Sequence, residues 1–250
     1  MFRRWWFVRL LRDPDPDPER RLSGRRLSKD QKLRQELLLR EWEVLRERLA
    51  GVAGERVAAA GEVFRAAELR LPPEAEAARR DYLWALEAYE AAGRLLDEAA
   101  DLPDLAAVVV LAERAVERLA AAHAVHAGRR PGTPVVRCFY NPLHAPVPPA
   151  PPAAARSSHR ERQRRRLGAR EAAADRRPAC PACRRAILAG QSPDVLPALL
   201  PASGRRSPRV LVPYYAVPQQ WSPWSATACG AYDDLAPALV LRGEHRRRRG

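Results

Sequence analysis

The chain has 250 residues, a formal net charge of +14 and 24 prolines, of which 18 follow residue 128. Four cysteines are too few for a disulfide scaffold in a chain of this length, and no stretch approaches the ~20 apolar residues of a membrane-spanning helix. Because proline interrupts helices and central strands, the chain beyond residue 128 must be built differently from the part before it. Charge divides at the same place: 14 cations against 19 acids give residues 28–128 a charge of −5, and 22 arginines against seven acids give residues 129–250 a charge of +15.

Residues 1–27 are a basic N-terminal segment and linker. Residues 2–12 alternate aromatic and aliphatic side chains with arginines, a pattern typical of peripheral contact with an anionic membrane surface. A frayed terminus, or a strand that docks on the body of the protein, is the alternative. Residues 13–18 alternate Asp with Pro and indicate an extended linker. The first residues contain no cleavage site typical of a signal peptide, so we expect a cytoplasmic protein.

Residues 28–128 are predicted to form a three-helix bundle. Ser28-Lys-Asp-Gln31 matches a capping box, in which a hydroxyl and an amide satisfy free backbone groups where a helix starts. A second helix is predicted over 74–99 and a third over 103–127, and the short link between them indicates an antiparallel hairpin. The expected apolar stripes are Leu38, Trp42, Leu45, Leu49 and Val52 in the first helix, Tyr82, Leu86, Tyr89, Gly93 and Leu96 in the second, and Leu105, Val108, Ala112, Val116 and Leu119 in the third.

Residues 129–245 are predicted to be a Pro/Arg-rich region that contains a disordered insertion over 145–178. Structure is expected to resume at Ala179, with a tight turn that leads into a short helix ended by Gly190. A strand is predicted over 209–215. Three aromatic residues beyond it are candidates for covering a small domain, and residues 245–249 are expected to form a loose tail. The three aromatic residues are Trp221, Trp224 and Tyr232.

Cysteine and histidine spacing in this region predicts a metal site. Cys180-Pro-Ala-Cys183 places two thiols across a tight turn, where both sulfurs can face one ion. Cys138 and His144 form a second pair across the turn-forming dipeptide Asn141-Pro142. Together they supply the three thiolates and one imidazole that tetrahedral zinc accepts, and Cys229 is an alternative to His144 as the fourth ligand.

Four protein ligands make a closed site, which is typical of structural zinc. The order of turn, hairpin and C-x2-C at a helix start resembles a treble-clef zinc finger, with the insertion in the place of the hairpin. The competing interpretations are a thioredoxin-like redox turn, which needs a βαβ surround, and four cysteines without a ligand role. His123 and His126, three residues apart near a helix end, are interpreted as dipole-complementing residues rather than a metal pair.

The sequence contains no Gly-rich phosphate loop and no G-x-S-x-G motif. We therefore expect a non-enzymatic interaction module, mainly α, in which an N-terminal helical bundle precedes a small irregular zinc segment and contacts an unknown protein partner. The alternatives are nucleic-acid binding through the Arg-rich span 156–177, which includes Arg164, Arg165 and Arg166, and membrane contact through residues 2–12. The predominance of Arg over Lys and the abundance of Ala and Pro, typical of a GC-rich genome, weaken the electrostatic argument for nucleic acid.

The C-terminal half resembles a group of uncharacterised actinobacterial proteins. The resemblance is carried by the segments 138–144 and 180–190 and by the motifs Val212-Pro-Tyr-Tyr215 and Gly230-Ala-Tyr-Asp-Asp-Leu235. It implies a helical hairpin followed by these segments over about residues 74–245, with the same four metal ligands, and some relatives occur in membrane-associated contexts. This chain departs from the group at Ala145, where a glycine is common, and in the insertion that follows.

Overall fold

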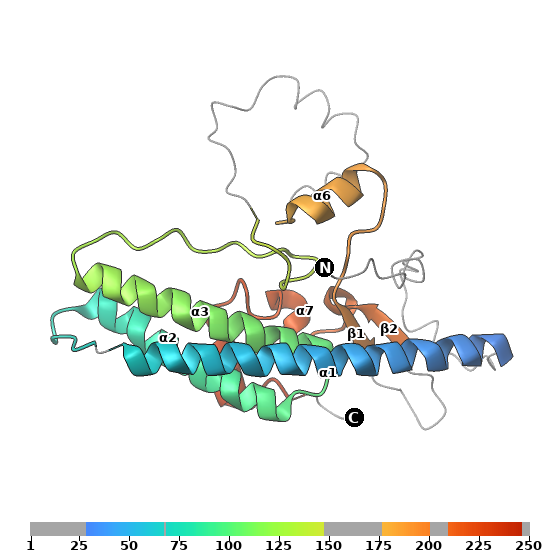
Figure 1. The fold of residues 1–250 in the computed structure, drawn as a ribbon, viewed down its shortest axis with the longest axis horizontal. Coiled ribbons are helices and arrows are strands. Elements are labelled where there is room, and N and C mark those ends of the chain that lie inside the picture. The colour runs from blue at the N-terminus through green and yellow to red at the C-terminus, as the bar shows by residue number, and fades with distance from the viewer. Residues whose placement is uncertain (1–28, 68, 148–176, 201–209, 247–250) are drawn as a thin grey trace, which may run out of the picture. The chain divides into compact units, whose positions relative to one another are not determined.

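The computed structural model describes residues 29–67, 69–147, 177–200 and 210–246 (Figure 1). They divide into two compact units: the Cys/His unit, Val135–Val195, and the helical unit, which comprises the described residues up to Pro134 and those from Leu196 onward. The predictions made for residues 1–27, for most of the insertion and for Arg164, Arg165 and Arg166 lie outside the described residues. The protein is mainly helical, as expected. None of the helices in the described ranges combines the length and apolar character needed to cross a bilayer.

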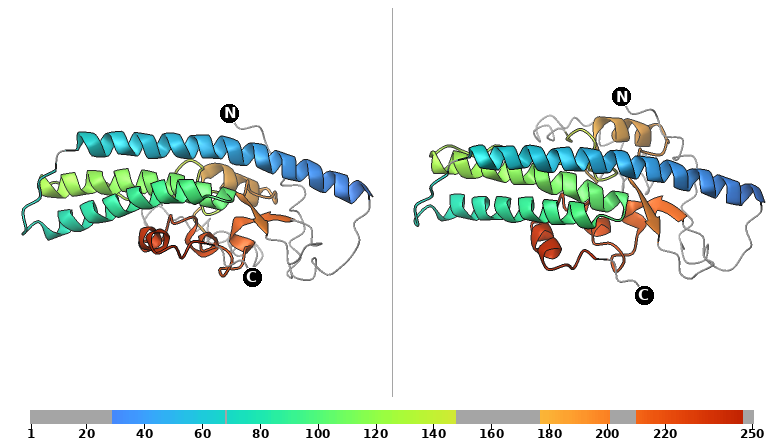
Figure 2. Two further views of the ribbon diagram at one scale, coloured as in Figure 1. Left: turned by 90° about the horizontal axis from the view of Figure 1, so that it is seen from below. Right: turned by 60° about the horizontal axis from the view of Figure 1, so that its bottom comes forward.

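Three long helices form the body of the helical unit, as the sequence predicted. They are α1 (Lys29–Ala66), α2 (Glu76–Glu98) and α3 (Leu102–His126), and α3 packs against both of the others (Figure 2). Only Ala99–Asp101 separates α2 from α3, which makes them the antiparallel hairpin that the short link indicated. Gly128 adopts a positive φ of 66° just beyond α3, the conformation that glycine favours at a helix end.

The buried face of α2 differs from the predicted one. It is composed of alanines and one leucine, whereas Leu86 is 37% exposed and the predicted tyrosines are only half-buried. Small side chains let neighbouring helices approach closely, and large apolar residues then flank the contact rather than fill it. One tyrosine shows this: Tyr89 stacks on Phe64 with ring centroids 5.1 Å apart, and its hydroxyl would lie only 2.6 Å from a Cβ added to Gly61. The buried residues of α2 are Ala78, Ala85, Ala88, Ala91, Ala92 and Leu95.

The predicted stripe of α1 is correct in its centre. Trp42 and Leu49 are buried, Leu38 and Leu45 are half-buried, and Val52 is 38% exposed because Ala53, one position further on, faces the bundle instead. The predicted capping residue Ser28 lies outside the described residues.

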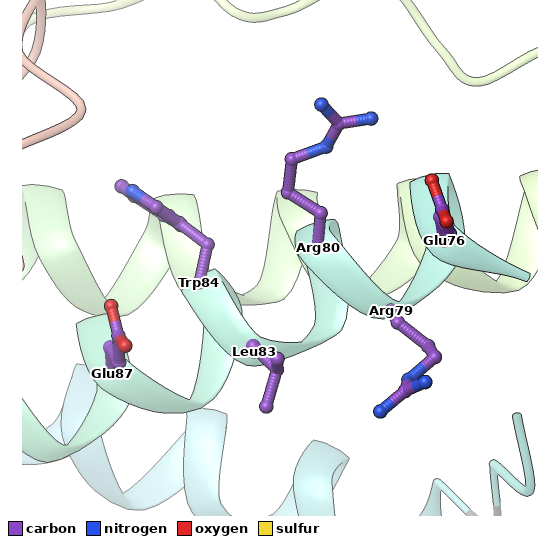
Figure 3. A pocket seen from close by; sticks show the side chains of 6 residues that line it. All are labelled: Glu76, Arg79, Arg80, Leu83, Trp84 and Glu87. Carbon is purple, nitrogen blue, oxygen red and sulfur yellow. The ribbon is translucent and has the colours of Figure 1, made fainter. Parts of the chain in front are cut away.

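A shallow depression on the outer surface of α2 is lined by residues of that helix alone (Figure 3). Arg80 and Trp84 point to one side of it, and Arg79 and Leu83 point to the other. Because its charged groups diverge, the depression offers no set of polar atoms aimed at one ligand.

The first turns of α3 are buried on every side, from Asp101 to Ala112. Asp101 caps the helix: its Oδ1 accepts hydrogen bonds from the backbone N of Leu102, at 2.8 Å, and from the indole of Trp42 in α1, at 3.1 Å. Its Oδ2 accepts from the backbone N of Leu199, at 2.9 Å. This single carboxylate therefore joins α1, α3 and the strand that contains Leu199.

Asp104 completes a capping box at the same helix start. Its Oδ2 accepts hydrogen bonds from the backbone N of Ala100, at 3.0 Å, and of Asp101, at 2.9 Å. Its Oδ1 accepts from the indole of Trp224, at 2.8 Å. The second carboxylate thus joins the hairpin link to the C-terminal part of the chain.

Residues from Leu196 onward belong to the helical unit and pack on α2 and α3, whereas the predicted region 129–245 grouped them with the Cys/His residues. They form a two-stranded antiparallel sheet of β1 (Pro197–Leu200) and β2 (Val210–Pro213), in which Leu200 lies opposite Val210. The predicted strand 209–215 is therefore shorter, because the 3-10 helix η4 (Tyr214–Ala216) follows it directly, and β1 was not predicted. The short helices α7 (Trp224–Thr227) and α8 (Ala236–Leu241) complete the unit. Trp224 is fully buried there and covers α3 rather than a separate small domain.

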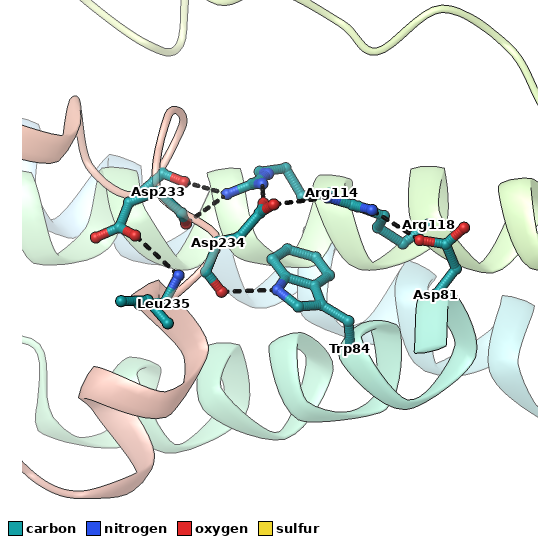
Figure 4. Close-up of polar contacts among 8 residues, drawn as sticks. Asp81, Trp84, Arg114, Arg118, Asp233, Asp234 and Leu235 are labelled. Atoms are coloured by element: carbon teal, nitrogen blue, oxygen red, sulfur yellow. Dashed lines mark hydrogen bonds and ion pairs between the residues drawn. The ribbon is translucent and has the colours of Figure 1, made fainter. Parts of the chain in front are cut away.

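An arginine and tryptophan network fastens the segment before α8 to α2 and α3 (Figure 4). The guanidinium groups of Arg114 and Arg118 lie 4.6 and 5.1 Å from the ring centroid of Trp84, whose indole donates to the carbonyl of Asp234 at 2.8 Å. Asp234 pairs with both arginines, and Arg118 also donates to Asp81 at 2.7 Å. Partial burial opposes the ionisation of Asp234, but its bonds to Arg114 and Arg118 outweigh this effect and lower its pKa.

The last described residues are held at the end of α2 and are not the loose tail that the sequence predicted. His245 is buried, and its Nε2 lies 2.8 Å from a carboxylate oxygen of Glu98. Arg246 donates two hydrogen bonds to the same carboxylate, and Arg94 contacts it at 3.3 Å. The bonds from Arg246 are the main reason why the pKa of Glu98 falls to about 2, against an opposing effect of burial, and His245 and Arg94 add to it.

We expect Asp101→Asn to lower the free energy of unfolding by about 2 kcal/mol, because an amide donor replaces an acceptor that the buried Trp42 and Leu199 groups require. Chemical denaturation followed by circular dichroism measures the change. The matched control is Asp97→Asn, on the exposed side of α2. An unchanged midpoint for Asp101→Asn would show that these hydrogen bonds do not stabilise the bundle.

We expect Glu98→Gln to release His245 and Arg246 from α2, because the neutral amide loses its charged bonds with Arg246. Hydrogen exchange of these residues should accelerate, while Glu90→Gln, an exposed position on α2, should leave it unchanged. Lowering the pH should also accelerate the hydrogen exchange of these residues. The pKa of Glu98 is lowered by folding, so its contribution is present above the ordinary carboxylate pKa and is lost as the pH falls from about 4 to about 2.

Candidate metal centre

The first half of the centre is a closed loop that carries Cys138 and His144. The backbone N of Val147 donates to the carbonyl of Val136 at 2.8 Å and closes the loop at its base. Asn141 shapes the turn within it, since its carbonyl accepts from the N of His144 at 3.0 Å and its side chain accepts from the N of Leu143 at 3.1 Å. The Asn-Pro turn predicted from the sequence thus brings Cys138 and His144 to the same side of the loop.

The second half is the start of helix α6 (Pro181–Leu188), which was predicted. Cys180 occupies the N-cap position, and its Sγ accepts from the backbone N of Cys183 at 3.5 Å. Pro181 fits the first turn because a proline there lacks only a donor that would be unpaired anyway. Gly190, with a φ of 66°, ends the helix as expected.

Two contacts fasten these halves to each other. The backbone N of Phe139 donates to the carbonyl of Pro178 at 2.7 Å, and the guanidinium of Arg177 lies over the Phe139 ring, 4.3 Å from its centroid. Phe139 directly follows Cys138, and Arg177 and Pro178 lie within three residues of Cys180, so these contacts limit the distance between the two ligand pairs.

The four ligand atoms of Cys138, His144, Cys180 and Cys183 all lie within 4.8 Å of one another. His144 Nδ1 is 3.5 Å from Cys180 Sγ and 3.4 Å from Cys183 Sγ. Zinc with bonds of about 2.0 Å to nitrogen and 2.3 Å to sulfur separates a nitrogen from a sulfur ligand by about 3.5 Å in a tetrahedron. The three cysteines are buried and His144 is half-buried, so the cluster has the spacing and the shielding of a metal centre.

The cluster favours negative charge on sulfur. A hydrogen bond from Cys183 lowers the pKa of Cys138 to about 3; burial opposes this and His144 assists it. The same contact with Cys138, together with burial, raises the pKa of Cys183. Burial opposes the protonation of His144, but Asp194 and Cys138 outweigh it and raise its pKa to about 10. An anionic thiolate beside two protonated neighbours is the arrangement from which a divalent cation can displace protons.

Asp194 belongs to the centre although the sequence did not point to it. Its Oδ2 lies 3.2 Å from Nε2 of His144, and its carbonyl oxygen lies 3.7 Å from Sγ of Cys183. No spacing rule predicts such a residue, because it contacts the candidate ligands and is not one of them. Only the path of the chain after α6 brings it there.

Cys229 does not replace His144 in the cluster. It lies in the helical unit, fully buried, with its backbone N bonded to the carbonyl of Trp224 at 3.2 Å. Burial, together with Asp104 and Asp101, raises its pKa and keeps it a neutral thiol. His123 and His126 lie in the last turn of α3. Among the described residues, neither belongs to a cluster of side chains that could bind a metal ion.

The structure describes little of the other segments that were predicted to bind nucleic acid or a membrane. Arg164, Arg165, Arg166 and residues 2–12 lie outside the described residues, so nucleic-acid binding and membrane contact stay predictions. Arg246, at the start of the basic tail, is bonded to Glu98.

No family model, no curated protein and no solved structure matches this chain. The resemblance of its C-terminal half to an actinobacterial group therefore stays a prediction.

We expect the apparent affinity for zinc to rise with pH. At pH 7 the raised pKa values of His144 and Cys183 keep both groups protonated, so a bound cation must release about two protons from this pair alone, whereas Cys138 releases none. Calorimetric titration in buffers of different ionisation enthalpy counts these protons. Proton release close to zero would contradict the ionisation pattern.

Proposed function

We propose that Cys138, His144, Cys180 and Cys183 bind one zinc ion as a structural site, and that the protein is a non-enzymatic interaction module. The observation that carries the proposal is the approach of four ligand atoms from two separate turns to within 4.8 Å. Three thiols and one imidazole are a donor set that favours zinc over the hard cations, which prefer oxygen ligands.

A structural role follows from the number of ligands. A catalytic zinc keeps a coordination position for water or substrate, whereas four protein ligands fill a tetrahedral site. The surroundings also need the metal. In its described residues the Cys/His unit has one helix of eight residues, and its buried apolar side chains are few beside the ligands themselves. Bound zinc supplies on the order of 10 kcal/mol, which a small core of this kind cannot supply.

The interaction role is the second part of the proposal. The metal fixes an exposed surface on α6, where Arg184 and Arg185 face outward, in a segment that otherwise has little core to hold it. We propose a protein as the partner and the cytoplasm as the location, because all four thiols are free and a reducing compartment keeps them available for metal.

The test is the metal content of the full-length protein purified without chelator. We expect about one zinc per chain by mass spectrometry, and removal with a chelator should accelerate hydrogen exchange in residues 135–147 and 177–195 while α1, α2 and α3 stay protected. The double variant Cys180→Ala with Cys183→Ala should lose the metal.

Cys229→Ala is the matched control, since it removes a buried cysteine outside the cluster. It should keep the zinc. Less than half an equivalent of zinc in the wild-type protein, or unchanged hydrogen exchange after chelation, would overturn the structural zinc site.

A further inference from the structure

The imidazole of His144 has its two nitrogens in different surroundings. Nδ1 faces the sulfurs of Cys180 and Cys183, at 3.5 and 3.4 Å, and Nε2 faces the carboxylate of Asp194, at 3.2 Å. A neutral imidazole carries a proton on only one nitrogen, and the other nitrogen then has the lone pair that a metal requires. The hydrogen bond made by one nitrogen therefore decides whether the other can bind metal.

We infer that Asp194 is a positioning residue of this centre, whose carboxylate accepts the Nε2–H of His144 and so holds the ring in the tautomer and orientation that present Nδ1 to the metal. The inference rests on the proposed metal site and adds a residue outside the ligand set. Such carboxylate and histidine pairs raise the basicity of the ligating nitrogen and reduce the rotation of its ring.

The turn that follows α6 places Asp194 beside the candidate ligands. The chain reverses after α6, where Gln191 N donates to the carbonyl of Ala186 at 2.8 Å beside the positive φ of Gly190. The carbonyl oxygen of Asp194 then lies 3.7 Å from Cys183 Sγ. Asp194 thus contacts one ligand from each half of the centre, His144 of the loop and Cys183 of α6.

No other carboxylate is available for this role among residues 135–147 and 177–195, because Asp194 is the sole acidic residue there. Its side chain is 52% exposed, so it contributes little to the packing of the unit. A substitution at this position should therefore act on the metal centre and leave the surrounding fold in place.

The experiment compares the zinc affinity of full-length variants by competition with a chromophoric chelator. We expect Asp194→Ala to weaken zinc binding by about 10- to 100-fold, and Asp194→Asn, which keeps an acceptor but not the charge, to weaken it less. Asp97→Ala removes an exposed carboxylate of α2 and is the matched control, with an affinity equal to that of the wild type.

A spectroscopic measurement separates positioning from a general loss of structure. In the zinc-bound wild-type protein, nitrogen-15 NMR should show the proton of His144 on Nε2, exchanging slowly because it is bonded to Asp194; in Asp194→Ala this exchange should be fast. Wild-type protein that binds zinc with its proton on Nδ1, or an Asp194→Ala affinity within twofold of the wild type, would overturn the role of Asp194 alone. Failure of the wild-type protein to bind zinc would overturn the metal site itself.

Discussion

The burial of two carboxylates at the start of α3 is the constraint on which the helical unit depends. Asp101 and Asp104 have exposed fractions of 1% and 6%, and every one of their four oxygens accepts at least one hydrogen bond. A buried carboxylate is tolerated only when such bonds and a favourable field replace its hydration, and the N-terminus of a helix provides that field. Besides the backbone of the helix start itself, the donors come from α1, β1 and α7, so these elements must be in place for the two carboxylates to be buried.

This requirement explains why the chain returns to the helices after the Cys/His unit. The first turns of α3 are surrounded on all sides, and three helices alone cannot surround one of their own ends. The periodicity of the sequence predicted the helices and the short hairpin link. It did not predict that the C-terminal part of the chain covers the start of α3. It also assigned the buried face of α2 to tyrosines and leucines, because an alanine face leaves no strong signal in hydrophobic spacing. The strand β1 has four residues and begins with Pro197, so it is too short for alternation to reveal it.

The candidate metal centre was more predictable than its surroundings. Tight turns determine which side chains within them converge, so the pairs Cys138 with His144 and Cys180 with Cys183 could be recognised from their spacing. The choice between His144 and Cys229 could not be made from spacing, because it depends on which unit each residue joins. Asp194 was unpredictable for the same reason: its contacts with His144 and Cys183 follow from the direction in which the chain leaves α6.

The Cys/His unit is an insertion in the sequence of the helical unit, and this connectivity would couple a bound metal ion to the bundle through chain entropy. Roughly 70 residues separate α3 from β1, and a zinc ion that joins Cys138 to Cys183 would shorten this loop to roughly 25 residues. The cost of bringing β1 to Asp101 would then fall by about 1 kcal/mol, since closure entropy grows only with the logarithm of loop length. The main stabilisation by zinc would stay within its own unit. Zinc would stabilise the helical bundle only through the lower entropic cost of closing this loop.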